Sequence, residues 1–199
     1  AMEIKRFLEK LSSDTPTPGG GSASALAGAL SASLIAMVAG LTSEKKGMRE
    51  LRRKALTLQG KLFNAVSEDA ASYDKVIEAY RLKKETEKER HNRQRAIQRA
   101  YRNATVPPHL VCQHSIELLD CCRFLILNGR RSAITDVGVA AFLADTALKG
   151  GLLNIGINLT SIWDKGFVKK MNQLRQRLDK RRGRLIKRIE KLLQKNLPI

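Results

Sequence analysis

The feature that most constrains the fold is the spacing of apolar residues, which recur three and four positions apart through most of the chain. This spacing matches the turn of an α-helix and places the apolar side chains on one face. No segment shows the sustained apolar-polar alternation, bounded by hairpin turns, that predicts a β-strand. The sequence therefore predicts an all-α protein, an up-and-down bundle of long helices.

Glycine, proline and capping residues divide this pattern into expected helices. The expected helices cover residues 4–11, 22–41, 44–83, the stretch from Thr86 to Pro107, 109–127, 135–163 and a last segment from residue 165. Residues 22–41 and 135–163 are rich in small side chains, which indicates close-packed helices at the centre of the bundle. We interpret residues 22–41 as a buried helix rather than a membrane span, because Ala, Gly and Ser dominate it.

With 199 residues the chain suits a single domain. We expect residues 1–164 to form the helical domain, and residues 165–199 to form a basic amphipathic helix continuous with it or packed on it. The apolar positions of that last segment, from Phe167 to Leu192, form a narrow seam of the kind that helices use to pack on a partner.

The charge of the chain is unevenly distributed. Residues 165–195 hold thirteen of the 37 Lys and Arg residues and two acids, a net +11 of the chain's +18. Such a surplus attracts polyanions, and Lys180-Arg181-Arg182-x-Arg184 would suit nucleic-acid phosphates. We do not favour nucleic-acid binding, because no nucleic-acid-binding fold signature is present and the surplus lies mostly in one terminal segment.

Cysteines and the start of the chain indicate a reducing compartment. Cys112, Cys121 and Cys122 cannot all pair within one chain and match neither a zinc site nor a redox motif, so we expect reduced core or interface thiols. The chain opens without a signal peptide, which favours the cytoplasm. His91 and His109 belong to no metal-binding spacing.

A glycine-rich loop is the first candidate for chemistry. Pro16-x-Pro18-Gly19-Gly20-Gly21-Ser22 leads directly into an expected helix, whose unpaired N–H groups and positive dipole end suit an anion. The alternative is that the glycines make a sharp turn and Ser22 caps the helix. The loop lacks the Gly-Lys-Ser/Thr ending of a Walker loop.

Six landmarks in a fixed order carry a resemblance to a known family. They are Pro16 to Ser22 with the Ala-rich helix to Thr42, Asp69-Ala70-x-x-Tyr73, Leu82-x-Lys84 with Glu89-Arg90, Ala104 to Pro107, Asp136 to Ala141, and Asn154-x-x-x-Asn158-Leu159. Together they resemble the cyclodeaminase domain of the formiminotransferase-cyclodeaminase family over about residues 7–164. Lys83 stands where that family usually has proline, and residues 132–135 also depart from its pattern, which puts the substrate preference in question.

The resemblance implies an all-α, dimeric enzyme that acts on the bridge between N5 and N10 of tetrahydrofolate, without a metal or redox cofactor. It would close 5-formiminotetrahydrofolate to the 5,10-methenyl form with release of ammonia, or hydrolyse the methenyl form. A basic helix at the C-terminus would also attract the polyglutamate chain of a folate. The remaining alternative is a non-catalytic basic helical protein that binds nucleic acid.

Asp69 and Asp136 are the candidate catalytic residues. Asp69 lies on the apolar face of its expected helix and falls at the family's catalytic aspartate position; the alternative is an ion pair with a neighbouring helix. The resemblance makes Asp136 a partner acid or an anchor for the pterin, and the alternative is a helix cap.

The candidate substrate-binding residues have equally plain structural alternatives. Asn154 and Asn158 share a helix face and would bind the pterin edge, or else backbone groups of a packed helix. Lys84 and Arg90 would meet the glutamate carboxylates of folate, or remain solvated surface charges. Tyr73 joins this set through its motif, and so do Gly19, Gly20, Gly21 and Ser22.

Overall fold

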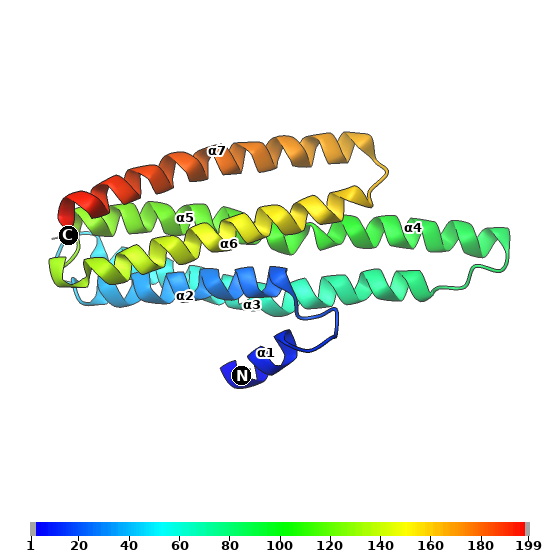
Figure 1. The fold of residues 1–199 in the computed structure, drawn as a ribbon, viewed down its shortest axis with the longest axis horizontal. Helices are drawn as coiled ribbons and strands as arrows, with labels where there is room; N and C mark the ends of the chain where they lie inside the picture. The colour runs from blue at the N-terminus through cyan, green and yellow to red at the C-terminus, as the bar shows by residue number, and fades with distance from the viewer. Residues whose placement is uncertain (1–2, 198–199) are drawn as a thin grey trace.

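The computed structural model describes residues 3–197, and in that range it contains seven α-helices, one short 3-10 helix and no strand (Figure 1). The predicted all-α bundle is confirmed. The elements are α1 (Ile4–Leu11), α2 (Gly20–Gly40), α3 (Met48–Arg81), α4 (Glu87–Ala104), α5 (Val106–Asn128), η1 (Arg131–Ala133), α6 (Ile134–Thr160) and α7 (Lys165–Asn196).

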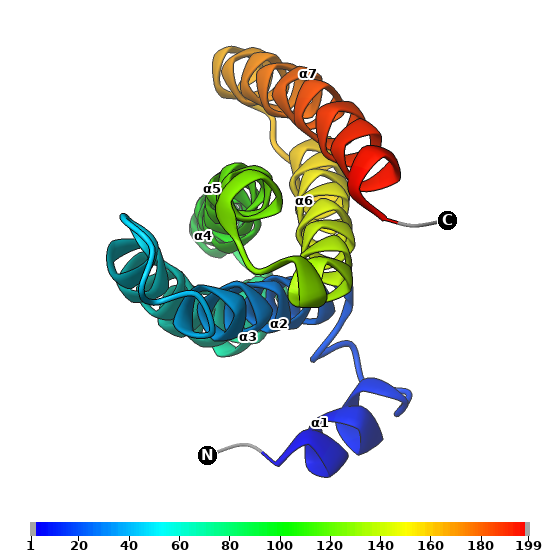
Figure 2. The same ribbon diagram turned by 90° about the vertical axis from the view of Figure 1, so that its left-hand side faces the viewer.

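The long helices are arranged around α2, α5 and α6. Figure 2 shows α2 and α3 side by side at one face, α5 and α6 in the middle, and α7 on the opposite side of the bundle. Beyond the bundle, the end of α3 and the first part of α4 project as a two-helix arm, while the last part of α4 lies beside the end of α6 (Figure 1). The arm has an apolar cluster of its own, formed by Val76, Ala79, Ile97, Ala100 and Ala104. Helix α1 lies on the side of α2 that faces away from α5, and its Phe7 is buried in the main core cluster.

The two helices rich in small residues do pack closely at the centre. The Ser31 hydroxyl of α2 donates a hydrogen bond of 2.7 Å to the Ala140 carbonyl of α6. A Cβ added to Gly150 of α6 would lie 1.9 Å from Ser24 Oγ, so the contact needs glycine there. Serine hydroxyls that bond backbone carbonyls let these helices approach while their polar atoms stay satisfied.

Two expected helix starts were wrong by three or four residues. Helix α3 begins at Met48 instead of residue 44, because Gly47 adopts φ 84°, a left-handed conformation that ends the preceding turns. Helix α5 begins at Val106, so Pro107 and Pro108 lie inside its first turn instead of before it. A proline is tolerated there because the first N–H groups of a helix have no partner within the helix.

The start of α4 agrees with its sequence signal. The Thr86 hydroxyl accepts a hydrogen bond from the Glu89 N–H at 3.2 Å, and Glu89 Oε2 accepts one from the Thr86 N–H at 3.0 Å. This reciprocal pair is a capping box.

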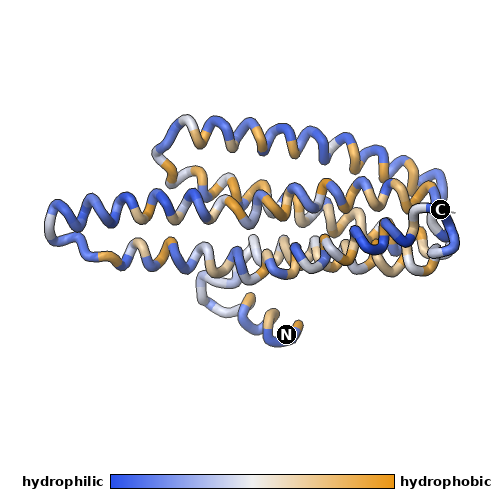
Figure 3. The backbone as a smooth tube through the Cα atoms, turned by 180° about the vertical axis from the view of Figure 1, so that it is seen from behind, coloured by the Kyte–Doolittle hydropathy of each residue, from blue (hydrophilic) through white to orange (hydrophobic). Residues whose placement is uncertain are grey.

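Helix α7 packs on α5 and α6, and its predicted seam is only partly confirmed. Ile189 is buried, but Leu185 and Leu192 are only partly buried, and the neighbouring Ile186 and Leu193 take the buried positions instead. Ile186, Ile189 and Leu193 are buried, while most of the remaining surface of α7 is hydrophilic (Figure 3). Two ion pairs join α7 to the bundle: Arg181 with Asp120 of α5 and Arg182 with Asp145 of α6, at 2.7 and 2.8 Å. Helix α7 therefore shares the main core.

The three cysteines are buried and unpaired, in agreement with the expected reduced core thiols. Burial raises the pKa of Cys112 to about 12 and that of Cys121 to about 11. Thiols in this state are poor nucleophiles.

By length and composition, α2 could cross a bilayer, the one helix in residues 3–197 of which this is true. This is weak evidence, since central helices of globular proteins share the same composition.

Candidate functional site

The N-terminus of α2 meets the middle of α3 at Asp69. A Cβ added to Gly21 would lie 2.2 Å from Asp69 Oδ1, so only glycine allows the carboxylate this close to the first turn of α2. The Ser22 hydroxyl lies 3.1 Å from Asp69 Oδ2 and 2.9 Å from the Val66 carbonyl oxygen. The structure thus brings the glycine-rich loop and Asp69, 47 residues apart, into one site.

Asp69 has no cationic partner. In residues 3–197 no Lys, Arg or His nitrogen lies within 4.0 Å of its oxygens, so the ion pair that was the structural alternative is not what holds it. Burial raises the pKa of Asp69 above its usual value, although hydrogen bonds from the Ser22 hydroxyl and N–H counteract the rise. A half-buried carboxyl group with a raised pKa and no counter-ion suits acid/base chemistry.

Asn154 lies beside this site and Asn158 lies one turn beyond it. A Cβ added to Gly20 would come within 3.9 Å of Asn154 Nδ2, which places Asn154 at the start of α2. Each amide donates one hydrogen bond of 2.8 Å to a carbonyl, Asn154 to Gly150 and Asn158 to Ala104. Over the described chain neither amide oxygen accepts a hydrogen bond, so both oxygens remain free to accept one from a ligand.

Asp136 lies at the other end of α6. Fourteen residues separate it from Gly150, about 21 Å along a helix axis. It is in the first turn of α6, but the capping residue is Ala133 and not Asp136. A single chain therefore does not bring Asp69 and Asp136 together.

Lys84 and Arg90 lie at the tip of the arm. Helix α3 runs about 18 Å along its axis from Asp69 to its last residue, Arg81, and Lys84 lies in the loop beyond it. Arg90 donates hydrogen bonds to the carbonyls of Lys84 and Glu85 at 3.4 and 2.7 Å, so it closes the loop between α3 and α4. Tyr73, in contrast, lies one helical turn from Asp69 and is partly exposed.

The loop before α2 is held against α3. The Thr17 hydroxyl donates a hydrogen bond of 3.0 Å to Asp74. A cavity of about 610 Å³ lies between this loop, α1 and α3, lined in part by Arg6, Thr17 and Asp74. Asp69 is not among the residues that line this cavity.

Sequence reasoning missed a basic groove between α2 and α3. It has a volume of about 1000 Å³ and is lined by Arg49, Arg52 and Arg53 of α3 and by small and apolar residues of α2. The Arg52 guanidinium lies over Gly40, where a Cβ would be 3.3 Å from Nε. The three arginines within five positions of one helix could have indicated a basic site from the sequence. The groove itself could not have been predicted, because it depends on a glycine of another helix that lies opposite.

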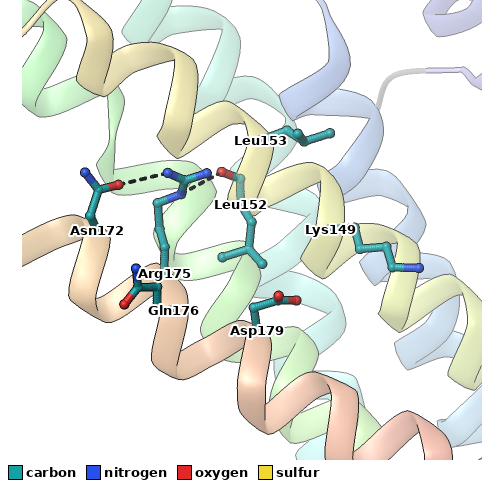
Figure 4. A pocket seen from close by; sticks show the side chains of 7 residues that line it. All are labelled: Lys149, Leu152, Leu153, Asn172, Arg175, Gln176 and Asp179. Atoms are coloured by element: carbon teal, nitrogen blue, oxygen red, sulfur yellow. Dashed lines mark hydrogen bonds between the residues drawn. The ribbon is translucent and has the colours of Figure 1, made fainter.

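A second cavity, of about 450 Å³, lies between α6 and α7 (Figure 4). Arg175 of α7 reaches across it and donates hydrogen bonds to the Leu152 carbonyl at 3.1 Å and to Asn172 Oδ1 at 2.9 Å. Its guanidinium fits against Gly156, where a Cβ would lie 2.7 Å from Nη2. These bonds assign Arg175 to the attachment of α7.

Comparison with known proteins gives one family. A sequence profile of the formiminotransferase-cyclodeaminase family matches residues 3–177. The methenyltetrahydrofolate cyclohydrolase of Methylorubrum extorquens is 33% identical over 174 residues, which cover 84% of this chain and 84% of that protein.

Two further relatives extend the comparison. The formimidoyltransferase-cyclodeaminase of Sus scrofa is 28% identical over 182 residues, and the match covers 88% of this chain but 33% of that longer protein. The crystal structure of formiminotetrahydrofolate cyclodeaminase from Thermotoga maritima superposes with a TM-score of 0.86 at 26% identity, and covers 97% of this chain and 96% of the other. That superposition includes α7.

Proposed function

The chain belongs to the formiminotransferase-cyclodeaminase family, and from this membership we propose that it is a folate enzyme acting on the N5–N10 bridge of tetrahydrofolate. Its reaction is the cyclisation of 5-formiminotetrahydrofolate to 5,10-methenyltetrahydrofolate with release of ammonia. The observation that carries the proposal is the unpaired, half-buried Asp69 carboxyl group at the N-terminus of α2.

The reaction needs proton transfer and little else. N10 attacks the formimino carbon, N10 loses its proton, and the C–N bond to the formimino nitrogen breaks as that nitrogen leaves as ammonia. One proton is taken up overall, because neutral substrate gives the methenyl cation and NH₃. Both reacting nitrogens belong to one molecule, so holding the substrate in a folded conformation makes the attack intramolecular.

Asp69 is the group we assign to this proton transfer. Its neighbour Ser22 supports both protonation states, because a hydroxyl group donates one hydrogen bond and accepts others. When Asp69 is ionised, the Ser22 hydroxyl donates to Oδ2; when Asp69 is protonated, the carboxyl donates to Ser22 Oγ while the hydroxyl donates to the Val66 carbonyl. An ionised Asp69 also stabilises the positive charge that develops on the bridging carbon and nitrogens as the methenyl cation forms.

Around Asp69 we assign the pterin to Asn154, Asn158 and Tyr73, and its anionic or carbonyl groups to the N–H groups after Gly19. Asp136, Lys84 and Arg90 have no assigned contact within one chain, because they lie about 20 Å away along their helices.

A second candidate, methenyltetrahydrofolate cyclohydrolase, is favoured by one observation. The relative of that name matches this chain over 84% of both lengths. In this reaction water adds to the methenyl carbon, one C–N bond of the bridge breaks, and a proton is released to give 10-formyltetrahydrofolate. Asp69 would then act as the base for the attacking water.

The remaining properties follow from these assignments as proposals. Neither reaction calls for a metal or redox cofactor, so we propose none, and we expect a homodimer in the cytoplasm. The folate carries one glutamate or a polyglutamate chain. Helix α7 lies on the side of the bundle away from α2 and α3 (Figure 2), which places it far from the Asp69 site of its own chain.

Absorbance of methenyltetrahydrofolate tests the function. Purified protein is given 5-formiminotetrahydrofolate in one experiment and methenyltetrahydrofolate in another, beside an enzyme-free control. Appearance of the methenyl band in the first identifies a cyclodeaminase, and accelerated loss of the band in the second identifies a cyclohydrolase. A folded protein that changes neither rate is not a folate enzyme, and salt-dependent nucleic-acid binding becomes the next measurement.

The role of α7 in folate binding is better tested by substituting its exposed bases than by truncating the chain. Removing residues after Asp164 would strip Ile189 and Leu193 from the core. Replacing Lys187, Arg188 and Lys191 by glutamine leaves the seam intact. A rise in KM for polyglutamylated but not monoglutamylated folate would assign the polyglutamate chain to α7, and equal KM values would exclude it.

A further inference from the structure

A row of basic side chains follows the outer face of α4. From residue 90 to residue 104 this helix holds five arginines and no Asp or Glu. Its apolar face packs on α3 in the cluster of the arm. His91, Arg95, Arg99 and Arg102 are exposed and recur at the spacing of three and four that places side chains on one side of a helix. The outer face of α4 therefore presents a line of positive charge to the solvent.

Two of these arginines have no counter-ion. Arg102 serves the fold, because its Nη2 lies 2.7 Å from Asp164 Oδ2 and its guanidinium lies 5.4 Å from the centre of the Phe167 ring. Over residues 3–197, in contrast, neither Arg95 nor Arg99 has a carboxylate within 4.0 Å. Like charges one helical turn apart repel each other and destabilise the helix. An anion bound between Arg95 and Arg99 would remove this repulsion.

The single tryptophan of the chain lies beside these arginines. Trp163 is 67% exposed and belongs to the connection between α6 and α7. The half-buried Gln98 of α4 fixes this connection: its Oε1 accepts a hydrogen bond of 2.8 Å from the Trp163 N–H, and its Nε2 donates one of 2.9 Å to the Ser161 carbonyl. An exposed indole on a fixed backbone is a preformed surface on which a flat ring can stack.

The arginines and the tryptophan line one cavity. It has a volume of about 390 Å³ and lies between the outer face of α4 and the α6–α7 connection. Arg95, Arg99 and Trp163 contribute to its lining together with the amides of Gln94 and Gln98, and no Asp or Glu is among its lining residues. A volume of this size is typical of pockets that hold a small molecule. The lining suits a ligand that is both flat and anionic.

This cavity is separate from the Asp69 site. Ala79 of α3 packs in the cluster of the arm with Ile97 and Ala100, which are the neighbours of the cavity-lining residues along α4. Ten residues separate Ala79 from Asp69, about 15 Å along the axis of α3. Neither of the folate reactions considered above takes up phosphate or a nucleotide. The proposed function therefore does not account for the cavity.

We propose that this cavity binds a nucleoside di- or triphosphate, with its base stacked on the Trp163 indole and its phosphates held by Arg95 and Arg99. Guanidinium groups form paired hydrogen bonds with phosphate oxygens. Arg95 and Arg99 are one turn apart, about 6 Å along the helix axis, so both can reach neighbouring phosphates of one molecule. The amide of Gln94 can donate and accept hydrogen bonds at the edge of the base.

The lining favours a free nucleotide over single-stranded nucleic acid. Proteins that bind single strands provide several aromatic side chains, on which successive bases stack. Trp163 is the one aromatic residue that lines this cavity. One indole and two free guanidinium groups match a single base and its own phosphates.

Fluorescence of the single tryptophan reports on this site alone. The wild-type protein is titrated with ATP, with ADP and with adenosine, with excitation at the long-wavelength edge of the indole band, where the bases do not absorb. We expect saturable quenching by ATP and ADP, and at least a tenfold weaker affinity for adenosine, which has the base but no phosphate. Equal affinity for adenosine, or no quenching by either nucleotide, overturns the proposal.

Substitution of the two free arginines tests the phosphate contacts. Arg95→Gln combined with Arg99→Gln should raise the Kd for ATP by about tenfold or more, because hydrogen bonds to charged groups are lost. Lys187→Gln combined with Arg188→Gln is the matched control, since it removes the same charge from the other end of α7 (Figure 1). The control should keep the wild-type Kd. Equal increases in the two double variants would mean that ATP responds only to net charge, and would contradict the site.

Calorimetry tests the stacking contact without the fluorescent group. Trp163→Leu should weaken ATP binding by about 5- to 100-fold, the usual contribution of one base stacked on an aromatic side chain. Circular dichroism checks that the variant is folded, which we expect because the Trp163 side chain is exposed. An unchanged affinity for ATP would show that the base does not stack on Trp163, and the proposed site would be wrong.

Two further ligands distinguish other occupants. If an oligothymidylate quenches Trp163 and neither ATP nor ADP does, the cavity belongs to single-stranded nucleic acid, and the free-nucleotide site is wrong. The same conclusion follows for a second folate site if tetrahydrofolate alone quenches. None of these measurements requires folate turnover, so inactivity in the folate assays counts against the proposed function and not against this inference.

Discussion

Helices α2 and α7 both pack on α6, but their sequences are arranged in opposite ways. Helix α2 has no charged residue and is held by small side chains and by serine hydroxyls that bond carbonyls of neighbouring helices. Helix α7 has a narrow apolar seam, ion pairs to Asp120 and Asp145, and an otherwise basic surface. The difference separates tasks: α2 brings chemical groups together at its N-terminus, and α7 covers the core while it carries most of the charge.

The largest expected effect is on catalysis at the α2 end. Asp69→Asn keeps the size of the side chain and its hydrogen bond from Ser22 but removes the titrating group. We expect kcat to fall by about 10²- to 10⁴-fold, the usual contribution of a positioned acid/base group. Steady-state kinetics with circular dichroism as a control for folding measures this, and a kcat within tenfold of wild type would remove Asp69 from the mechanism.

The next effect is on the stability that α7 contributes. Ile189 is fully buried, so Ile189→Ala should lower the free energy of unfolding by about 2–5 kcal/mol, from lost burial and the cavity left behind. The kcat of the folded protein should not change. The adjacent exposed base gives a matched control, since Lys187→Ala should alter stability by no more than about 0.5 kcal/mol. Urea denaturation measures both, and a loss of kcat without a loss of stability would give α7 a catalytic task.

A smaller effect on stability should distinguish alanine substitutions at two glycines, Gly21 and Gly60. Gly21→Ala places a Cβ against the Asp69 carboxylate, and should cost about 1–3 kcal/mol of stability and also lower kcat, because Asp69 must move. Gly60→Ala, inside α3, meets no atom within 4 Å and should instead stabilise the protein by about 0.5–1 kcal/mol. Thermal unfolding of the two variants decides the matter; equal effects would mean that the close approach at Gly21 is not required.

The smallest effect is on the pH dependence of stability. Burial raises the pKa of Asp69 in the folded chain. As the pH rises from the ordinary aspartate pKa to the raised one, the unfolded chain loses its proton first, so the free energy of unfolding falls over that interval. The Asp69→Asn protein should lack this part of the fall. Relative to wild type, its free energy of unfolding should therefore be higher at neutral pH than at low pH. Unfolding titrations from pH 3 to pH 7 on both proteins test the direction, and parallel curves would contradict it.

Local patterns predicted those parts of the structure that depend on neighbouring residues. The spacing of three and four predicted the helices, and the Thr86 and Glu89 pair predicted the start of α4. The seam predicted for α7 included the buried Ile189 but not the buried Ile186 and Leu193. The predicted start of α5 was wrong because proline occurs in two different helix positions. It breaks the interior of a helix and is tolerated in the first turn, and only the path of the chain distinguishes these cases.

The residues of the candidate site were also predicted only in part. Asp69 and the glycine-rich loop were singled out from the sequence, and the structure brings them together. Asp136, Lys84 and Arg90 were singled out by the same resemblance, yet they lie along helices that carry them about 20 Å away. The basic groove of Arg49, Arg52 and Arg53 went unnoticed, because a groove needs a second helix with glycine at the point of contact.

By itself, the sequence determined the helical class, the cap of α4, the concentration of charge at the C-terminus and the membership in a folate enzyme family, whereas the Ser22 cap considered for α2 is replaced by Gly19. These depend on periodicity and on short motifs, which are local along the chain. Only the tertiary structure decided that Asp69 has Ser22 and no cation beside it, and that two arginines of α4 share a cavity with Trp163 of the α6–α7 connection. The reason is that packing of helices distant in sequence sets burial, counter-ions and cavities.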